Sequence, residues 1–139
     1  MSERQSLPPA VTTMNGDGAS PYVLLGEHAS RFIPAQYRGL GLPDSELVRH
    51  IAWDIGIGVL GQALSKHLDA PFLAAGYSRL LVDCNRPLRA PSSIPEVSET
   101  TRIPGNLALS AAERRQRADR YYWPFQHAVG ALLDRRRSS

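Results

Sequence analysis

The segment that most constrains the fold is residues 76–86, GYSRLLVDCNR, where a short apolar run comes directly before a cluster of polar side chains. The run, Leu80–Val82, is too short for a helix and has the length of a buried strand. Pro87 cannot donate to a sheet ladder, so we expect the strand to end before it. Ligands of open α/β sheets bind where the strands end. The sequence therefore predicts a buried strand that carries polar groups to the edge of a sheet.

Those polar groups are an acid, an amide and a guanidinium, namely Asp83, Asn85 and Arg86. A guanidinium binds a carboxylate or phosphate through two parallel N–H bonds, and Asn85 adds a donor or an acceptor. The alternative is a salt-bridged strand end, because ion pairs also occur at such positions.

A second apolar run, Tyr22–Leu25, ends in a similar way. Gly26, Glu27 and His28 follow it, so His28 lies just beyond the end of a predicted strand. Two polar clusters at equivalent strand ends indicate a shared cleft.

The remaining pattern predicts an α/β fold. A helix is expected from Asp44 or Ser45 to Leu68, because apolar residues recur there at helical spacing. A strand is expected within residues 70–75, and the order strand, helix, strand favours a right-handed crossover in a parallel or mixed sheet. After an irregular segment, a capping box of Ser110 and Glu113 predicts the start of a last helix, which Pro124 should kink or split in two.

Residues 1–20 lack periodicity and are expected to form a disordered tail, which leaves residues 21–139 as one domain. Cys84 is the only cysteine, which excludes an internal disulfide and fits a cytoplasmic protein. No apolar run approaches membrane-spanning length, so no membrane partner is expected. The small sheet should expose an edge, which a second copy of the chain (a homo-oligomer) or a larger assembly is expected to cover.

The net charge is +3, and arginine supplies nearly all of the positive charge. Four arginines lie beside aromatic residues 121–123, a combination that occurs in nucleic-acid-binding helices: Arg114, Arg115, Arg117 and Arg120. The aromatic residues fall at core spacing, which leaves these arginines as a solvated face. Nucleic acid is therefore not an expected partner.

Four segments together resemble the N-terminal part of the N-formylglutamate amidohydrolase (N-formylglutamate deformylase) family. They are EHAS at 27–30 with IP at 33–34, RHIAWDIG at 49–56, YSR at 77–79 with DCNR at 83–86, and IPGN at 103–106. The resemblance implies a three-layer α/β sandwich with a small, mostly parallel or mixed sheet. Such a fold is similar to the zinc carboxypeptidases and aspartoacylase-type deacylases (phosphorylase/hydrolase-like folds), and it would be incomplete in this chain.

The resemblance also implies metal-assisted hydrolysis of the amide of a small-molecule N-acyl amino acid, such as N-formyl-L-glutamate, to formate and glutamate. Members of the family are about twice as long, and their later half contains a His-containing segment that this chain lacks. The alternative is therefore a fragmentary or inactive member that serves as a binding or scaffold module for an acidic metabolite.

For the metal, the resemblance points to Zn²⁺ at His28, since a neutral imidazole is a good zinc donor, with Asp54 as a candidate carboxylate ligand. Glu27 is the alternative to Asp54 as the carboxylate ligand, and it is also the one candidate for the general base, which is otherwise unassigned. The carboxypeptidase-like pattern has a Glu three residues after the histidine, where this chain has Arg31. The alternative for His28 is a strand-end histidine bonded to the backbone.

For the substrate, the resemblance assigns carboxylate binding to Asn85 and Arg86, with Ser78 and Arg79 as further binding residues. The alternative for Arg79 is a structural ion pair with Asp83, because alternation places both residues on the same face of the predicted strand.

Two further residues, His50 and Asp83, are expected to support the site. The alternative for His50 is a hydrogen-bonded pair with Asp54, because the two are spaced i,i+4 within the predicted helix.

Overall fold

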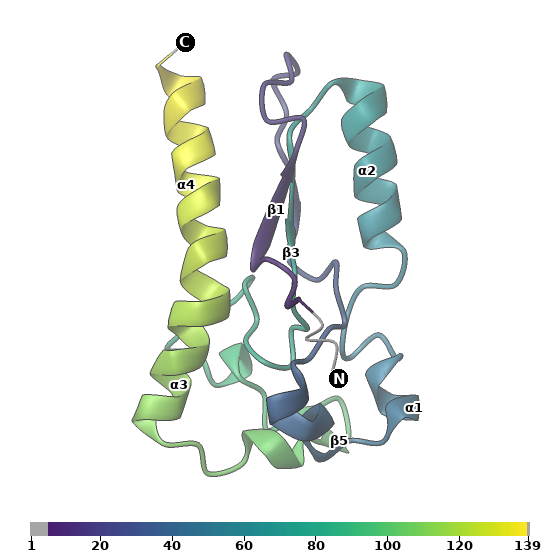
Figure 1. Ribbon diagram of the computed structural model, residues 1–139, viewed down its shortest axis with the longest axis vertical. Helices are drawn as coiled ribbons and strands as arrows, with labels where there is room; N and C mark the ends of the chain where they lie inside the picture. Colours follow the sequence, from purple (N-terminus) through teal and green to yellow (C-terminus); the bar gives the residue numbers. More distant parts are fainter. Residues whose placement is uncertain (1–5, 139) are drawn as a thin grey trace.

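A mixed three-stranded sheet lies between two long helices in the computed structural model, which describes residues 6–138 (Figure 1). The central strand is β3 (Phe72–Ala75). β2 (Leu24–Gly26) pairs with it in parallel, and β1 (Val11–Met14) pairs with it in antiparallel on the other side. The expected strands near residues 22–25 and 70–75 are confirmed, with β2 displaced by about one residue at its end.

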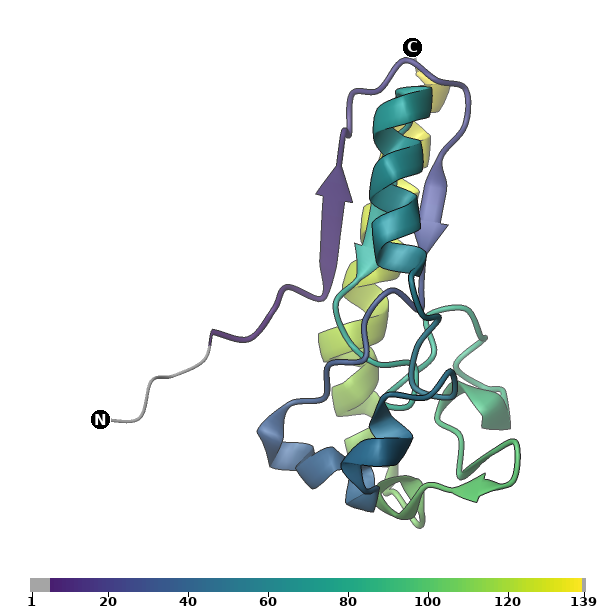
Figure 2. The same cartoon turned by 90° about the vertical axis from the view of Figure 1, so that its right-hand side faces the viewer.

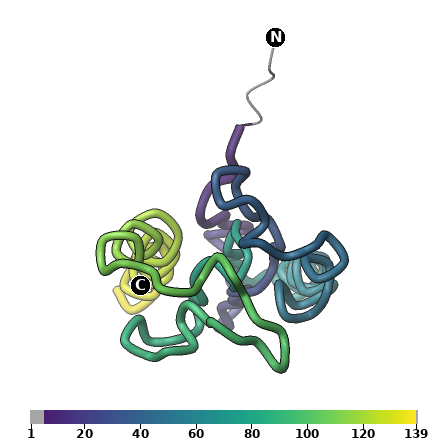
Figure 3. Tube along the Cα trace, turned by 90° about the horizontal axis from the view of Figure 1, so that it is seen from below, coloured from purple at the N-terminus to yellow at the C-terminus, as the bar shows by residue number. Residues whose placement is uncertain are grey.

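The sheet is the middle of three layers. α2 (Ile57–Leu68) covers one face and α4 (Trp123–Arg137) covers the other, as Figures 1 and 3 show. α2 approaches closely because Gly61 lies on the ring of Phe72, where an added Cβ would come within 2.2 Å of a ring carbon. On the other side Phe125 and Leu132 of α4 pack with Leu73 of β3. A small, mixed α/β arrangement was expected and is confirmed.

Short elements and irregular segments fill the other half of the molecule, beyond the ends of β2 and β3 (Figure 2). They are the 3-10 helices Ala35–Gly41, Pro91–Ser93 and Pro104–Asn106, the helix α1 (Asp44–Leu47), the hairpin of β4 (Val97–Ser98) and β5 (Thr101–Arg102), and α3 (Ala111–Arg117). A core cluster below the sheet joins these segments to the beginning of the last helix.

The expected strand at Leu80–Val82 is wrong, although its burial is right. Leu80 and Leu81 are fully buried, but they lie in a turn. Their backbone carbonyls bind side chains instead of a neighbouring strand: Asn106 donates to Leu80 at 2.8 Å and Arg117 donates to Leu81 at 3.1 Å. Buried backbone groups need partners, and here polar side chains provide them.

The single helix expected from Asp44 to Leu68 is also wrong. α1 stops at Leu47, and α2 begins only after Gly56, whose φ of 84° is left-handed. Between them the chain turns inward and buries Ile51 and Ala52. Glycine adopts that backbone conformation without steric cost, so Gly56 starts α2 from a sharp bend.

Part of the expected disordered tail is a strand, because β1 lies within residues 1–20 and its four residues all pair with β3. Thr12 and Thr13 are β-branched and suit an edge strand. Residues 1–5 of that predicted tail lie outside the described residues.

The last helix begins at the predicted capping box. The N–H of Glu113 donates to Ser110 Oγ at 3.1 Å, and the N–H of Ser110 donates to Glu113 Oε2 at 2.8 Å. A π-helical turn, Ala118–Tyr122, then separates α3 from α4, directly before Pro124. Proline lacks an N–H and clashes with the carbonyl four residues back, so a widened turn at this position is the physical form of the predicted split.

Among residues 6–138, no helix is both long enough and apolar enough to cross a membrane.

Candidate functional site

Four charged or titratable side chains meet where the segments following β2 and β3 come together: His28, Asp54, Arg79 and Asp83. His28 lies two residues beyond β2, and Asp83 lies in the turn segment that follows β3. Because β2 and β3 are parallel, these segments leave the same end of the sheet. The structure thus joins the two predicted polar clusters.

The four side chains form a closed ring of contacts. His28 Nε2 lies 2.6 Å from Asp83 Oδ1, and His28 Nδ1 lies 3.4 Å from Asp54 Oδ2. Arg79 closes the ring on the other side, 3.5 Å from Asp54 Oδ1 and 3.3 Å from Asp83 Oδ2. Each carboxylate therefore contacts both the imidazole of His28 and the guanidinium of Arg79.

The ring is buried on one side and open on the other. The side chains of His28 and Asp83 are 9% and 4% exposed, whereas that of Asp54 is 51% exposed. A ligand would reach the ring from the Asp54 side. The backbone ties this corner together, since the N–H of Asp54 donates to the carbonyl of His28 at 2.9 Å.

Asp83 is the electrostatic centre of the ring. Burial by itself raises the pKa of this carboxyl, but hydrogen bonds from His28 and from the Asn85 N–H, with the positive charge of Arg79, outweigh burial and hold the pKa below its ordinary value. Asp83 is therefore ionised at neutral pH, and it can accept a hydrogen bond from a ring N–H of His28.

This carboxylate sets the tautomer of His28. We assign the ring proton to Nε2, because its partner Asp83 is a charged acceptor at 2.6 Å. In the neutral imidazole Nδ1 then carries a lone pair and faces the Asp54 carboxylate. Nδ1 and the Asp54 carboxylate face each other at 3.4 Å, an arrangement that either a proton on Nδ1 or a metal cation between the two atoms would stabilise.

The donor set fits part of a zinc site. Two ligands that each stand about 2.0–2.1 Å from a tetrahedral zinc ion lie about 3.3–3.4 Å apart, which matches the distance from His28 Nδ1 to Asp54 Oδ2. Asp83 on the second ring nitrogen is the carboxylate–histidine arrangement that supports metal-binding imidazoles. Catalytic zinc requires three protein ligands, and residues 6–138 contain no group of three His, Cys, Asp or Glu side chains arranged around a common ion.

Asn85 and Arg86 begin next to the ring. The N–H of Asn85 donates to Asp83 Oδ1 at 2.8 Å, and the N–H of Arg86 donates to the Asp83 carbonyl at 3.2 Å. Both side chains are exposed, and within residues 6–138 the Arg86 guanidinium has no ion-pair partner. Arg79, by contrast, is already engaged by two carboxylates, as the alternative for it anticipated.

Three other predicted site residues lie in different surroundings. Ser78 is fully buried, and its hydroxyl donates to the Ala52 carbonyl at 2.7 Å, so its role is structural. Glu27 is half-buried, and its negative charge is among the causes, after burial, that raise the pKa of Cys84 to about 12. His50 is not paired with Asp54 on a helix: it lies in the connection before α2, and its Nε2 is 2.6 Å from Glu99.

A pocket of about 690 Å³ is lined by Ala29, Ser30 and Trp53, which adjoin His28 and Asp54 in the sequence, but none of the four ring residues lines it. Arg31, which also lines this pocket, stacks over the Trp53 ring at 5.6 Å. Neither Asn85 nor Arg86 lines this pocket, so it is separate from the predicted carboxylate-binding residues.

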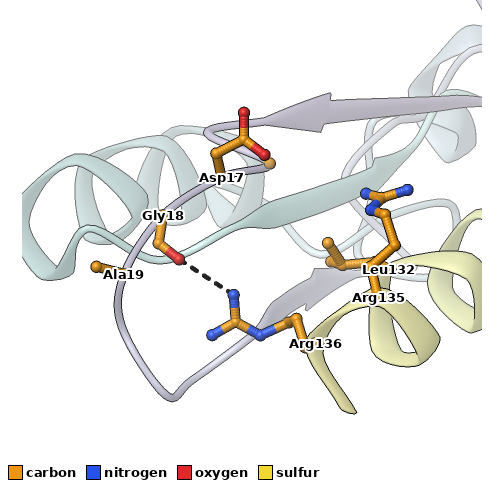
Figure 4. A pocket seen from close by; sticks show the side chains of 7 residues that line it. Asp17, Gly18, Ala19, Leu132, Arg135 and Arg136 are labelled. Carbon is orange, nitrogen blue, oxygen red and sulfur yellow. Dashed lines mark hydrogen bonds between the residues drawn. The ribbon is translucent and has the colours of Figure 1, made fainter. Parts of the chain in front are cut away.

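Another pocket, of about 390 Å³, lies at the opposite end of the sheet (Figure 4). Arg136 enters it from α4 and donates to the carbonyls of Gly18 and Ser20. This arginine ties the loop between β1 and β2 to α4, so the contact is structural and remote from His28.

Arg117 was expected on a solvated face, but the structure buries this cation. Arg117 is 3% exposed and donates to the Asn106 side chain at 2.6 Å and to the Gly105 carbonyl at 3.1 Å, besides Leu81. Burial lowers its pKa. The network fixes the turn that leads to Asp83, and its one signal in the sequence is the polar Asn106 within an apolar, proline-bounded segment.

Comparison with known proteins gives three findings. The family model described as N-formylglutamate amidohydrolase matches residues 20–139. No curated protein matches the chain. Among solved structures, the gene product Atu2144 from Agrobacterium tumefaciens superposes with a TM-score of 0.91 at 38% identity, over 94% of this chain and 52% of its own. This chain therefore spans about half of the length of that relative.

Proposed function

Because the chain belongs to the N-formylglutamate amidohydrolase family, we propose that it takes part in metal-assisted hydrolysis of the amide of an N-acyl amino acid such as N-formyl-L-glutamate. The observation that carries the proposal is the ring at the end of β2 and β3. There a buried carboxylate holds one ring nitrogen of His28, and the other ring nitrogen lies 3.4 Å from a half-exposed second carboxylate.

In this proposal His28 and Asp54 would be two of the residues that hold the metal. A bound zinc ion would supply an electrophile for the acyl carbonyl and lower the pKa of water. Asp83 holds the proton on His28 Nε2 and keeps the imidazole in one orientation. Arg79 binds both carboxylates, which keeps Asp54 turned toward Nδ1.

Arg86 and Asn85 bind the carboxylate of the substrate. Arg86 is exposed next to Asp83, and its planar guanidinium matches a carboxylate through two parallel hydrogen bonds. Arg79 is less suited to this role because its charge is already matched by Asp54 and Asp83.

The described residues supply two metal donors and no carboxylate positioned as a general base, so the complete reaction needs further groups. We assign these to a polypeptide equivalent to the part of the Agrobacterium protein that this chain does not cover. We further propose that the whole fold is related to the zinc carboxypeptidases and aspartoacylase-type deacylases, which the three-layer arrangement supports.

Formate release tests the proposal. The chain is incubated with Zn²⁺ and N-formyl-L-glutamate, alone and together with that polypeptide. We expect formate above the chelated control in at least one condition, and its loss in His28→Ala. Arg86→Ala should raise KM at least tenfold, whereas Arg89→Ala, another exposed arginine of the same segment, should not. Absence of zinc-dependent formate in both conditions would contradict the proposal.

A second candidate is a binding module for an acidic metabolite, which the two-donor set favours. It predicts that N-formyl-L-glutamate raises the Tm in the presence of a chelator, and that Arg86→Ala abolishes the shift. A Tm shift that disappears on chelation supports the metal-assisted site instead.

A further inference from the structure

A smaller pocket, of about 240 Å³, lies between the segment that follows Asp83 and the junction of α3 with α4 (Figure 1). None of the four ring residues around His28 lines it, so it is separate from the candidate site. We infer that this pocket, which we call the junction pocket, binds a free α-amino acid with a large apolar side chain.

The floor of the junction pocket is apolar and buried. Ile94 and Ala118 are 2% and 5% exposed, and the partly buried Leu88 lines the pocket with them. Ser93 is polar and buried, but its hydroxyl already donates to the Leu88 carbonyl at 2.9 Å. An apolar cavity of about 150 Å³ is large enough to hold benzene, so the volume of this pocket suits the side chain of leucine or phenylalanine.

Trp123 forms one wall of the pocket, and the π-helical turn places it there. The Trp123 N–H bonds the Ala118 carbonyl five residues back, which brings the two residues toward one face of the helix. In a regular α-helix, residues five apart lie about 140° apart around the axis and face different ways. Tyr122 packs edge-on against the indole and His127 stacks on it, with ring centroids 5.1 and 5.8 Å away. The wall is therefore preformed, as in most small-molecule sites.

Three charged side chains surround the mouth of the pocket, and they carry both signs. Arg115 and Asp119 are exposed and Arg114 is half-buried, so these charges lie at the opening above the buried floor. None of the three has an ion-pair partner within residues 6–138. Guanidinium groups bind a carboxylate, and a carboxylate binds an ammonium group. The mouth thus matches the two opposite charges that an α-amino acid carries on one carbon.

Other ligands match this mouth less well. A fatty acid would bring its carboxylate near Asp119, and an amine would leave both guanidinium groups without an anion. Within a polypeptide the α-amino and α-carboxyl groups are used in amide bonds, so a docked segment would present neither charge. An N-acyl amino acid lacks the ammonium group, so the ligand differs from the substrate of the proposed function and its test is independent of metal and of catalysis.

Tryptophan fluorescence tests the inference. The chain has two tryptophans, so Trp53→Phe leaves Trp123 as the only reporter, and calorimetric titration of the unsubstituted chain provides a second measurement. We expect saturable binding of L-phenylalanine in both measurements. 3-Phenylpropionate lacks the ammonium group and 2-phenylethylamine lacks the carboxylate, so each should bind at least tenfold more weakly. Glycine, which has no apolar side chain, should show no saturable binding.

Variants of the pocket separate its floor from its mouth. Ala118→Leu fills the floor and should abolish binding of L-phenylalanine. The double variant Arg114→Gln, Arg115→Gln removes the cations and should weaken binding at least tenfold. The matched control is Arg89→Gln, Arg102→Gln, which removes the same charge from two exposed arginines that do not line the pocket and should bind as the unsubstituted chain does.

Circular dichroism should show equal helix content in all of these variants, so that a loss of binding reports on the pocket. The inference is overturned if L-phenylalanine gives no saturable signal, or if either of its singly charged analogues binds as tightly. It is also overturned if the Arg114→Gln, Arg115→Gln variant retains the affinity of the unsubstituted chain.

Discussion

At the scale of single residues, Asp83 determines the chemistry of the candidate site. It accepts from the His28 ring and from the Asn85 N–H, and it pairs with Arg79. One buried carboxylate therefore fixes the orientation and the tautomer of the imidazole. A charge that is almost completely buried is tolerated only with this number of partners.

Asp83→Asn keeps the shape of the side chain and removes its charge. Because the pKa of Asp83 is lowered in the folded chain, its stabilisation is complete above the ordinary value of 3.8 and is lost as pH falls through the folded value. We expect the variant to lower the free energy of unfolding by about 1.5–3 kcal/mol at pH 7. In urea titrations the difference in the free energy of unfolding between the variant and the wild type should become smaller below pH 3.8.

Asp54→Asn serves as the comparison, since Asp54 also pairs with Arg79 and His28 but is half exposed. This variant should lower the free energy of unfolding by less than about 1 kcal/mol. Equal losses for the two variants would show that burial does not distinguish the two carboxylates.

Arg117→Lys probes the buried cation. A lysine cannot reproduce the fork that reaches Leu81, Asn106 and Gly105 together, so two carbonyl-type acceptors lose a partner. We expect a loss of about 2–4 kcal/mol in chemical denaturation. Arg115→Lys, on the exposed side of the same helix, should change stability by less than about 0.5 kcal/mol, and a comparable loss there would argue against the network.

How much of the site was predictable also differs by residue. The meeting of His28 and Asp83 was predictable, because each lies after an apolar run, but only His28 follows a strand, whereas Asp83 follows a buried turn. The burial of Arg117 was not, because its partners are carbonyls that only the folded chain brings to it. One arginine among several in a basic run carries no signal of burial by itself, and the polar Asn106 in an apolar segment was the only indication.

At the scale of elements, apolar pattern predicted burial better than it predicted backbone path. Leu80–Val82 is buried as expected but forms a turn, since Asn106 and Arg117 satisfy the carbonyls that a sheet would otherwise pair. The predicted long helix is interrupted for a similar reason. Its apolar residues Ile51 and Ala52 are buried, but in a bend that left-handed Gly56 makes possible.

Gly61→Ala tests the packing of α2 on the sheet. The new Cβ would lie 2.2 Å from the buried ring of Phe72, so the helix must shift. Overpacking typically costs about 1–3 kcal/mol, which exceeds the helix-propensity gain of up to about 1 kcal/mol. Thermal unfolding should therefore show a lower Tm.

Gly130→Ala is the matched substitution in α4, where nothing lies within 4 Å of the added Cβ. It should stabilise the chain by about 0.5–1 kcal/mol, because only the helix propensity changes. A stable Gly61→Ala variant would show that α2 is not held by close contact with Phe72.

At the scale of the whole molecule, two parallel strands and their following segments explain why the site lies at one end of the sheet. That arrangement was predictable from the order strand, helix, strand and from the polar residues after each strand. The antiparallel β1 was not predictable, because its few apolar residues lie in a segment rich in glycine, serine and threonine. The apolar residues of α2 were expected to face the core. Leu60, Leu64 and Leu68 are instead partly exposed, because the sheet beneath the helix has only three strands.

The central claim, that His28 presents a free Nδ1 beside Asp54, is tested most directly by ¹⁵N NMR of the histidine rings during a zinc titration. With only four histidines the signals can be assigned by substitution. We predict that His28 carries its proton on Nε2 and that zinc shifts the Nδ1 resonance in the wild type but not in Asp54→Asn. A proton found on Nδ1, or a His28 ring that zinc leaves unchanged, would contradict the account.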